Sequence, residues 1–235
     1  MGRAFEYRKA RKMKRWGAMA KAFTRIGKEI AMSVKENGGD PNTNARLRMA
    51  INNAKGVNMP KDKVDSAIKR ALNKDEKNYE IVFYEGYGPH GIPMVVETAT
   101  DNPTRTVANI RMYFNRNGGQ MGTNGSVSFM FNRKGVFKFD ALAINLDDIE
   151  LDLIDCGAED IMLEDDEIIV YTAFEDFGAM QKGLEERNLE IKSAELQFVP
   201  TMTKEVGDDE MVQLEKLIDA LEEDEDVNAV YHNIA

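Results

Sequence analysis

Residues 160–171, DIMLEDDEIIVY, have the pattern of a β-hairpin. Two short runs with apolar residues, 160–163 and 168–171, flank an acidic turn at 164–166, and such spacing is typical of paired strands. A helix and a strand are expected on each side of the hairpin. In chain order they are a strand at 136–139, a helix at 147–155, a helix at 175–187 and a strand at 190–198. This βαββαβ order predicts a ferredoxin-like domain, with two helices on one face of an antiparallel sheet.

A second α/β domain is expected on both sides of this unit. Before the unit, the sequence predicts strands at 81–84 and 92–98, a helix from Asn102-Pro103 to about residue 115, and a strand at 127–131. After it come a helix at 208–223 and a strand at 227–232. One helix and one strand cannot form a domain alone, so we expect this tail to complete the earlier sheet. The predicted boundaries are 79–134 with 201–235 for a discontinuous domain, and 135–200 for a ferredoxin-like acidic insertion.

Residues 1–78 are predicted to form a basic helical domain. Apolar residues from about Trp16 onward are spaced three or four apart, and residues 37–39, Asn-Gly-Gly, end this helix. Asp40 and Pro41 predict the N-cap and first turn of a second helix, and Pro60 predicts the start of a third. Residues 1–14 are interpreted as a mobile arm or as a helix that orders on binding. The expected fold class is therefore α+β, with a helical N-terminal domain and two α/β domains.

Positive charge is concentrated in the helical part. Residues 1–80 have 20 Lys and Arg against 9 Asp and Glu, a net of +11, whereas residues 81–235 have 11 against 32, a net of −21. Nine Lys or Arg occur from Arg8 to Lys28 without one acidic residue, so the usual solvated helix face of alternating charges does not explain them. Uncompensated charge repels itself, and nucleic acid would neutralise it. The candidate nucleic-acid-binding residues are Arg8, Lys9, Arg11, Lys12, Lys14, Arg15, Lys21, Arg25, Lys28, Arg46, Arg48, Lys55, Lys61, Lys63, Lys69 and Arg70.

Other motifs have structural explanations. Residues 86–91 match G-x-G-x-x-G, but a β pattern follows, whereas the dinucleotide fingerprint must open a helix. His90 and His232 have neither a Cys nor another His near them in sequence, and His232 is expected to have a hydrogen-bonded structural role. Cys156 is expected to be small and partly buried, and the acidic turn at 164–167 to be solvated rather than catalytic.

The sequence also predicts several absences. The only cysteine is Cys156, so no disulfide forms within the chain. No nucleophile-elbow, phosphate-loop or metalloprotease motif occurs, so we expect no enzyme activity, no metal, no cofactor and no small-molecule substrate. The start is charged, and no run approaches the roughly 18 apolar residues of a membrane span, which predicts a cytoplasmic protein without a membrane partner.

Ten short segments distributed along the chain resemble the YebC/PmpR family. They are GGDP (38–41), NARLR (44–48), NMPKD (58–62), IKR (68–70), YEGYGP (84–89), TDN (100–102), RTV (105–107), NGG (117–119), GSV (125–127) and VYHN (230–233). The resemblance implies three domains, a helical one followed by two α/β domains around a cleft. It also implies DNA-binding transcriptional regulation for bacterial members, and translational activation for a mitochondrial relative. The opening MGRAFEYRK (1–9) departs from the family's usual Gly-His-Ser-Lys-Trp start, although it keeps the positive charge.

Three function hypotheses follow. The first is a non-enzymatic nucleic-acid-binding regulator, named by the resemblance as a DNA-binding transcriptional regulator, whose basic head contacts phosphates. The second is a translation factor that binds ribosomal RNA and the ribosome through the same head. The third is an enzyme with a site in the cleft between the acidic domains. Phosphate neutralisation is common to the first two, so charge alone does not separate DNA from RNA, and the sequence does not set the oligomeric state.

Overall fold

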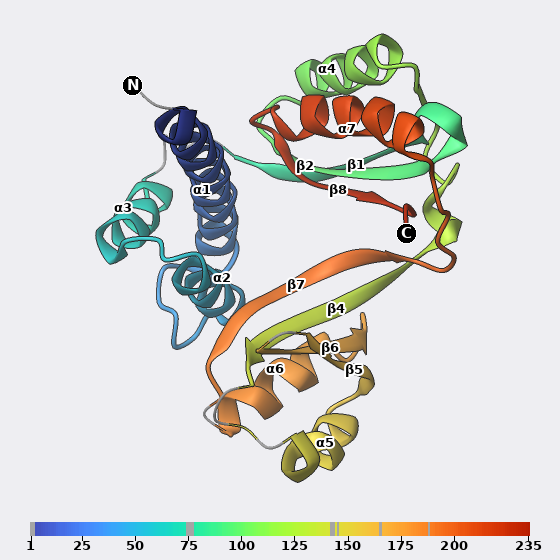
Figure 1. Ribbon diagram of the computed structural model, residues 1–235. Coiled ribbons are helices and arrows are strands. Elements are labelled where there is room, and N and C mark those ends of the chain that lie inside the picture. The colour runs from blue at the N-terminus through green and yellow to red at the C-terminus, as the bar shows by residue number, and fades with distance from the viewer. Residues whose placement is uncertain (1–2, 74–77, 142–143, 145, 165, 188) are drawn as a thin grey trace. The chain divides into compact units, whose positions relative to one another are not determined.

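Three helices form the first of two units, residues 1–77 (Figure 1). The computed structural model describes residues 3–73, 78–141, 144, 146–164, 166–187 and 189–235, with side chains from residue 19 onward except that of residue 147. The helices are α1 (Arg3–Asn37), α2 (Ala45–Gly56) and α3 (Lys61–Ala71), and α1 packs against both others. Each helix buries one apolar stripe, as helical spacing requires. The stripes include Ile26, Ile30 and Val34, then Leu47, Ala50 and Ala54, then Val64, Ala67 and Ala71.

The connection between α1 and α2 is organised by Asn44. Its side-chain oxygen accepts the backbone N–H of Leu47 at 3.0 Å, which makes Asn44 the N-cap of α2. Its amide nitrogen donates to the carbonyl oxygens of Ser33 and Gly38, both at 2.8 Å. The cap predicted at Asp40 is therefore wrong. The Asp40 carboxylate instead accepts the N–H of Asn42 at 2.9 Å, in a turn that precedes the helix.

The second unit, residues 78–235, contains two four-stranded sheets. In the first sheet the order is β3-β1-β2-β8, with all pairs antiparallel. Its strands are β1 (Glu80–Tyr87), β2 (Pro93–Thr100), β3 (Gln120–Met121) and β8 (Val227–His232). Helices α4 (Pro103–Arg116) and α7 (Asp208–Glu222) cover one face (Figure 1). Because β8 pairs with β2, the tail does join the earlier sheet, and on this basis we keep the discontinuous domain boundaries as a proposal.

The second sheet has the predicted βαββαβ order. Its strands are β4 (Phe131–Asp140), β5 (Ala158–Glu164), β6 (Glu167–Ala173) and β7 (Ile191–Pro200). They are antiparallel in the order β5-β6-β4-β7, and helices α5 (Leu146–Asp155) and α6 (Phe177–Glu186) lie on one face (Figure 1). Phe137 and Phe139 are fully buried on the helix side, where the rings of Phe137 and Phe177 are 4.7 Å apart. The expected ferredoxin-like arrangement is confirmed.

A strand predicted at residues 127–131 is absent from the structure, and Glu85 explains the difference. The Glu85 carboxylate accepts the backbone N–H groups of Gly125, Val127 and Ser128 at 2.8, 2.7 and 2.9 Å. These N–H groups are therefore not available to a strand ladder, and a short 3-10 turn, η2 (Ser128–Met130), precedes β4. Burial alone raises the pKa of the Glu85 carboxyl, but the three backbone hydrogen bonds outweigh it and lower the pKa below its ordinary value.

A second buried carboxylate, Asp226, attaches the C-terminal tail to the first sheet. Its Oδ2 atom lies 2.8 Å from the Thr106 hydroxyl, 3.2 Å from the Thr100 hydroxyl and 2.6 Å from Nη2 of Arg105. Thr100 ends β2, whereas Arg105 and Thr106 lie in the first turns of α4. The contacts span about 120 positions of sequence and connect the segment after α7 with the start of α4. They make the last helix and strand part of the core of this sheet.

Candidate nucleic-acid interface

The basic residues of the first unit lie mainly on its outer surface. Among the sixteen predicted positions, the six from Arg8 to Arg15 lie on the helix α1, but their side chains are outside the described residues. Seven others have exposed side chains. These are Lys21 on α1, Arg46 and Lys55 on α2, and Lys61, Lys63, Lys69 and Arg70 on α3. A surface of this kind offers several ammonium and guanidinium groups to a polyanion.

Three predicted positions are less exposed. Lys28 is only 8% exposed, so it is not proposed as a phosphate contact. Arg25 and Arg48 are half-buried, and Arg48 donates from Nη1 to the carbonyl oxygen of Pro41 at 2.9 Å. That bond holds the guanidinium group of Arg48 against the turn before α2. The sequence could not distinguish these three residues from the rest, because their burial depends on how the helices pack.

The helix periods place cations on the outward flanks. On α2, Arg48, Asn52 and Lys55 follow at i, i+4 and i+7, a spacing that puts them on one side, away from buried Leu47 and Ala54. Asn44 fixes the start of this helix and so sets the direction in which the three side chains leave it. The sequence missed Asn44, although Asn followed by a helical apolar pattern is a recognised cap signal.

On α3, Lys63 and Arg70 are seven residues apart and therefore lie on the same flank. Asp62 and Asp65 are also exposed on this helix, so its surface is basic only on balance. Arg46 forms an ion pair with Glu36, but both side chains are about half exposed. A pair in water is worth roughly 0–1 kcal/mol, so a phosphate could replace Glu36 as the partner of Arg46 at little cost. Within the described residues, the ammonium groups of Lys55, Lys61, Lys63 and Lys69 form no ion pair.

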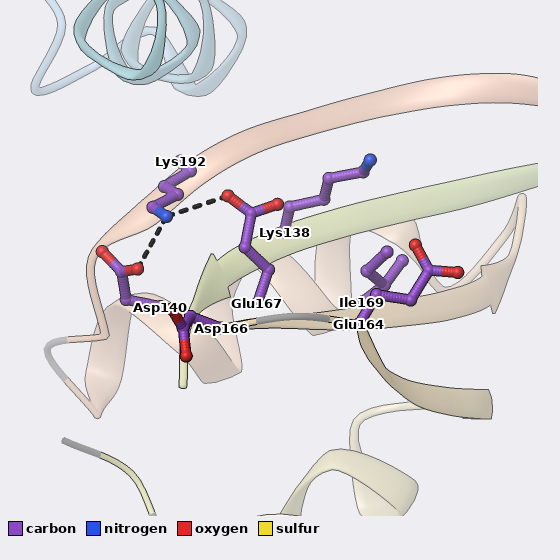
Figure 2. Close-up of a pocket in the computed structure, with 7 residues that line it drawn as sticks. All are labelled: Lys138, Asp140, Glu164, Asp166, Glu167, Ile169 and Lys192. Atoms are coloured by element: carbon purple, nitrogen blue, oxygen red, sulfur yellow. Dashed lines mark hydrogen bonds and ion pairs between the residues drawn. The ribbon is translucent and has the colours of Figure 1, made fainter. Parts of the chain in front are cut away.

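A polar pocket on the second sheet is lined in part by the acidic turn, and its geometry shows whether the carboxylates of this turn are arranged for catalysis. It has a volume of about 470 Å³ and includes Lys138, Asp140, Glu164, Asp166, Glu167, Ile169 and Lys192 (Figure 2). Lys192 lies between two carboxylates, at 2.6 Å from Asp140 and 2.8 Å from Glu167. Lys192 donates hydrogen bonds to both carboxylates, and these bonds, the one to Asp140 most strongly, raise the pKa of Lys192. The carboxylates are thus partners of a cation rather than a pair sharing a proton, and Asp165 of the predicted turn lies outside the described residues.

The glycine-rich residues 86–91 connect β1 to β2 and open no long helix, so the prediction of a turn is confirmed. Gly86 belongs to β1, where an added Cβ would lie 2.7 Å from the carbonyl oxygen of Gln120. His90 has a positive φ of 60°, and its two ring nitrogens lie 3.3 Å from Glu210 and 3.2 Å from Gln213. These contacts hold the turn against α7.

Cys156 and His232 are the remaining candidate residues. Cys156 is partly buried, as predicted. His232 lies in β8, but its Nδ1 is buried without a hydrogen-bond partner among the described residues, so the expected hydrogen bond is wrong for this atom. Burial lowers the pKa of His232. Among the described residues, no three His, Cys, Asp or Glu side chains gather as metal ligands would. No helix in the described part is long and apolar enough to cross a bilayer.

Comparison with known proteins covers almost the whole chain. A family model described as "TACO1/YebC protein N-terminal domain" matches residues 3–74, and one described as "TACO1/YebC second and third domain" matches residues 79–234. The chain is 54% identical to a "Probable transcriptional regulatory protein" of Cytophaga hutchinsonii, covering 100% of this chain and 99% of the relative. A protein with the same name from Flavobacterium johnsoniae is 55% identical, with the same coverage.

A solved structure has a similar fold. It is the crystal structure of a conserved hypothetical protein from Aquifex aeolicus, with a TM-score of 0.79 and 33% sequence identity. The similarity covers 92% of this chain and 90% of the other. The α+β architecture described above is therefore shared with an experimentally determined protein.

Proposed function

The chain belongs to the TACO1/YebC family, and we propose that it is a nucleic-acid-binding regulator of transcription whose N-terminal unit binds phosphate groups. The observation that carries the proposal is the separation of charge, +11 in residues 1–80 against −21 in the remainder. The names of the two bacterial relatives quoted above support a regulatory role in transcription. In bacteria the DNA lies in the cytoplasm, which is the location that the proposal implies.

Phosphate binding follows from the exposed cations of the three helices. Each Lys or Arg that neutralises a phosphate releases a counterion, so the affinity should fall linearly on a logarithmic salt scale. The acidic second unit repels the same polyanion, which confines contact to the basic unit. The proposal includes no catalytic step, and neither a cofactor nor a small substrate.

The relatives' names favour DNA as the target. They give no support to the second hypothesis, a translation factor bound to ribosomal RNA. The chemistry of the basic helices does not itself distinguish the two polymers, because phosphate contacts carry no base information. The choice between them is therefore an outcome to be measured.

The test is a fluorescence-anisotropy titration of the full chain with labelled duplex DNA and with a structured RNA of equal phosphate number. Reversing four charges, Arg11, Lys12, Lys14 and Arg15 to Glu, should weaken binding and reduce the salt slope by about 3 to 4. Replacing Lys61, Lys63 and Lys69 of α3 by Gln should reduce it by about 2 to 3. Lys216 to Glu, on an exposed position of α7, is the matched control and should change neither quantity.

Each outcome has a defined meaning. Unchanged affinity and slope in both multiple variants would refute phosphate binding by the N-terminal unit. Lys216 to Glu changes the net charge by a quarter of the change in the fourfold variant, so a loss of about a quarter of the size would show that only the net charge matters. A clear preference for the RNA at matched salt, together with co-sedimentation with ribosomes, would move the function from transcription to translation. Far-UV circular dichroism of each variant reports whether the helices of the first unit are folded.

A further inference from the structure

Helix α5 and the adjoining strand β5 expose apolar side chains that the core does not use. Leu151 is 75% exposed and Ile154 50% on the helix, and Leu163 is 61% exposed on the strand. The inward side of α5 is occupied by Leu153, which is fully buried. Leu163 pairs with Ile168, which pairs with Phe139, so the three share the face of the sheet that carries the helices. Leu151 and Ile154 lie on sides of α5 turned away from Leu153, and α5 packs against β5, so the exposed apolar side chains belong to two neighbouring elements, as at interaction surfaces.

Strand β5 is also an edge of its sheet. The order β5-β6-β4-β7 gives it one neighbour, β6, so its other side has backbone groups outside the ladder. The N–H of Ile161 donates to the side chain of Asp160 at 2.9 Å, which indicates that alternate N–H groups of β5 face away from β6. Edges are commonly protected by charged side chains, above all Lys, by Pro, by bulges or by a covering element. In β5, AEDIMLE, the charges and the register irregularity between Ala158 and Asp160 lie toward the ends of the strand, and residues 161–163 between them have neither a charge nor Pro.

The charge around this surface has one sign. From Ala141 to Gln181 the sequence has 13 Asp and Glu and no Lys or Arg. Exposed carboxylates on the two elements include Asp148, Glu150, Asp155, Glu159, Asp160 and Glu164. Three ion pairs in this region use cations from outside the run, namely Lys134 with Glu159, Arg187 with Asp152 and Lys192 with Glu167. The other exposed carboxylates form a surface that repels nucleic acid and attracts cations.

We propose that α5 and β5, here called the α5–β5 edge, bind a lysine- and arginine-rich segment of another protein in extended form. Its cations would face the carboxylates, and its intervening apolar side chains would cover Leu151, Ile154 and Leu163. Its backbone would pair with the open side of β5, as in other additions of a strand to a sheet edge. An apolar segment without charge would leave the carboxylates unpaired, and a polyanion would be repelled.

The probe is a fluorescein-labelled peptide in which Lys and Val alternate, titrated into the full chain and followed by anisotropy. A Glu and Val peptide of the same length tests the charge, and oligolysine of equal charge tests the need for apolar side chains. We expect binding of the first peptide, no binding of the second, and at least tenfold weaker binding of the third. Leu151→Ser and Leu163→Ser should each lower the affinity for the first peptide about tenfold.

Matched variants on α7 distinguish binding at the α5–β5 edge from unspecific attraction between opposite charges. Glu164→Gln should lower the affinity for the Lys and Val peptide about threefold, whereas Glu215→Gln on α7 should leave it unchanged. Val212→Ser changes an apolar residue of α7 that is 52% exposed, and should have no effect. Equal losses with Glu215→Gln, or oligolysine binding as tightly as the Lys and Val peptide, would overturn the proposal in favour of unspecific attraction.

Two further outcomes would also overturn the proposed binding of a basic segment at the α5–β5 edge. The absence of any binding would do so directly. Self-association that disappears in the Leu151→Ser and Leu163→Ser variants would assign the edge to a second copy of this chain instead. Neither result depends on nucleic acid, so this proposal and the proposed function can fail independently.

Discussion

Replacing Glu85 by Gln should destabilise the second unit by about 2–4 kcal/mol. The carboxylate is 7% exposed and binds three backbone N–H groups, with Oε1 accepting from Gly125 and Oε2 from Val127 and Ser128. An amide retains one acceptor oxygen and places an NH₂ group where the second oxygen was. The more favourable orientation keeps the oxygen on Val127 and Ser128 and directs the NH₂ group at the N–H of Gly125.

The magnitude follows from these bonds. One hydrogen bond to a charge is lost, at roughly 1.5–3 kcal/mol, and two others become bonds to a neutral oxygen, at roughly 0.5–1 kcal/mol less each. Gly125 is exposed, so its N–H can turn to water and recover part of the loss. A total of about 2–4 kcal/mol is a large share of the 5–15 kcal/mol typical of a domain.

The assay is urea unfolding observed with two probes. Far-UV circular dichroism reports both units, whereas the ultraviolet absorbance of tyrosine reports mainly the second unit, because six of the seven tyrosines lie in residues 78–235. We expect the tyrosine transition to shift to lower urea, while the part of the dichroism change that comes from the first unit stays in place. Glu80→Gln, an exposed position on the same strand, is the control and should change the free energy of unfolding by less than about 0.5 kcal/mol.

The pH dependence gives an independent check. The pKa of Glu85 is lower in the folded chain than in the unfolded one, so its stabilisation is complete above the unfolded pKa of about 4.3 and is lost as the pH falls through the folded value. The difference in stability between the native chain and Glu85→Gln should therefore shrink below about pH 4. A Glu85→Gln protein as stable as the native chain at pH 7 would refute the role assigned to this carboxylate.

Two other changes test the remaining polar centres. Asn44→Ala removes the cap of α2 and its two bonds to carbonyl oxygens, so the free energy of unfolding of the first unit should fall by about 2–4 kcal/mol. The helical dichroism of this unit should then be lost at lower urea, and Asn42→Ala, exposed in the same turn, is the comparison. Thr106→Val keeps the shape of the side chain but removes a buried hydroxyl 2.8 Å from Asp226. The free energy of unfolding of the second unit, measured by circular dichroism, should fall by about 1–3 kcal/mol. Thr104→Val, on the exposed side of α4, should change it little.

The order of the elements could be predicted because it depends on local patterns. Alternating and helical spacing of apolar residues is visible in sequence, and this is why the hairpin around residues 164–166 and the strand Val227–His232 were predicted correctly. The strand predicted at 127–131 was wrong for a different reason. Its N–H groups bind a carboxylate about 40 positions earlier, and no local pattern reveals a partner at that distance.

The helix start at α2 shows the same limit at shorter range. Asp40 followed by Pro41 is a good local cap signal, but Asn44 also bonds to Ser33 and Gly38 on the preceding helix. The tertiary contacts therefore select the later cap. Among the basic positions, a count of charges identifies the unit that carries them. It cannot show that Lys28 is buried or that Arg48 is held by Pro41.

The chain thus carries one surface that is basic on balance and one acidic edge, and the salt dependence of binding should differ between them. At physiological ionic strength the Debye length is about 8 Å, so opposite charges cancel only where they are nearly in contact. A basic surface that binds phosphates is therefore compatible with an acidic α5–β5 edge that binds cations. Phosphate binding depends on counterion release and should fall steeply between 50 and 200 mM salt. Binding at the edge includes apolar burial, which salt does not screen, so its affinity should fall less over the same range. If both affinities fell equally, Leu151 and Leu163 would contribute nothing, and the edge would be only a source of unspecific attraction.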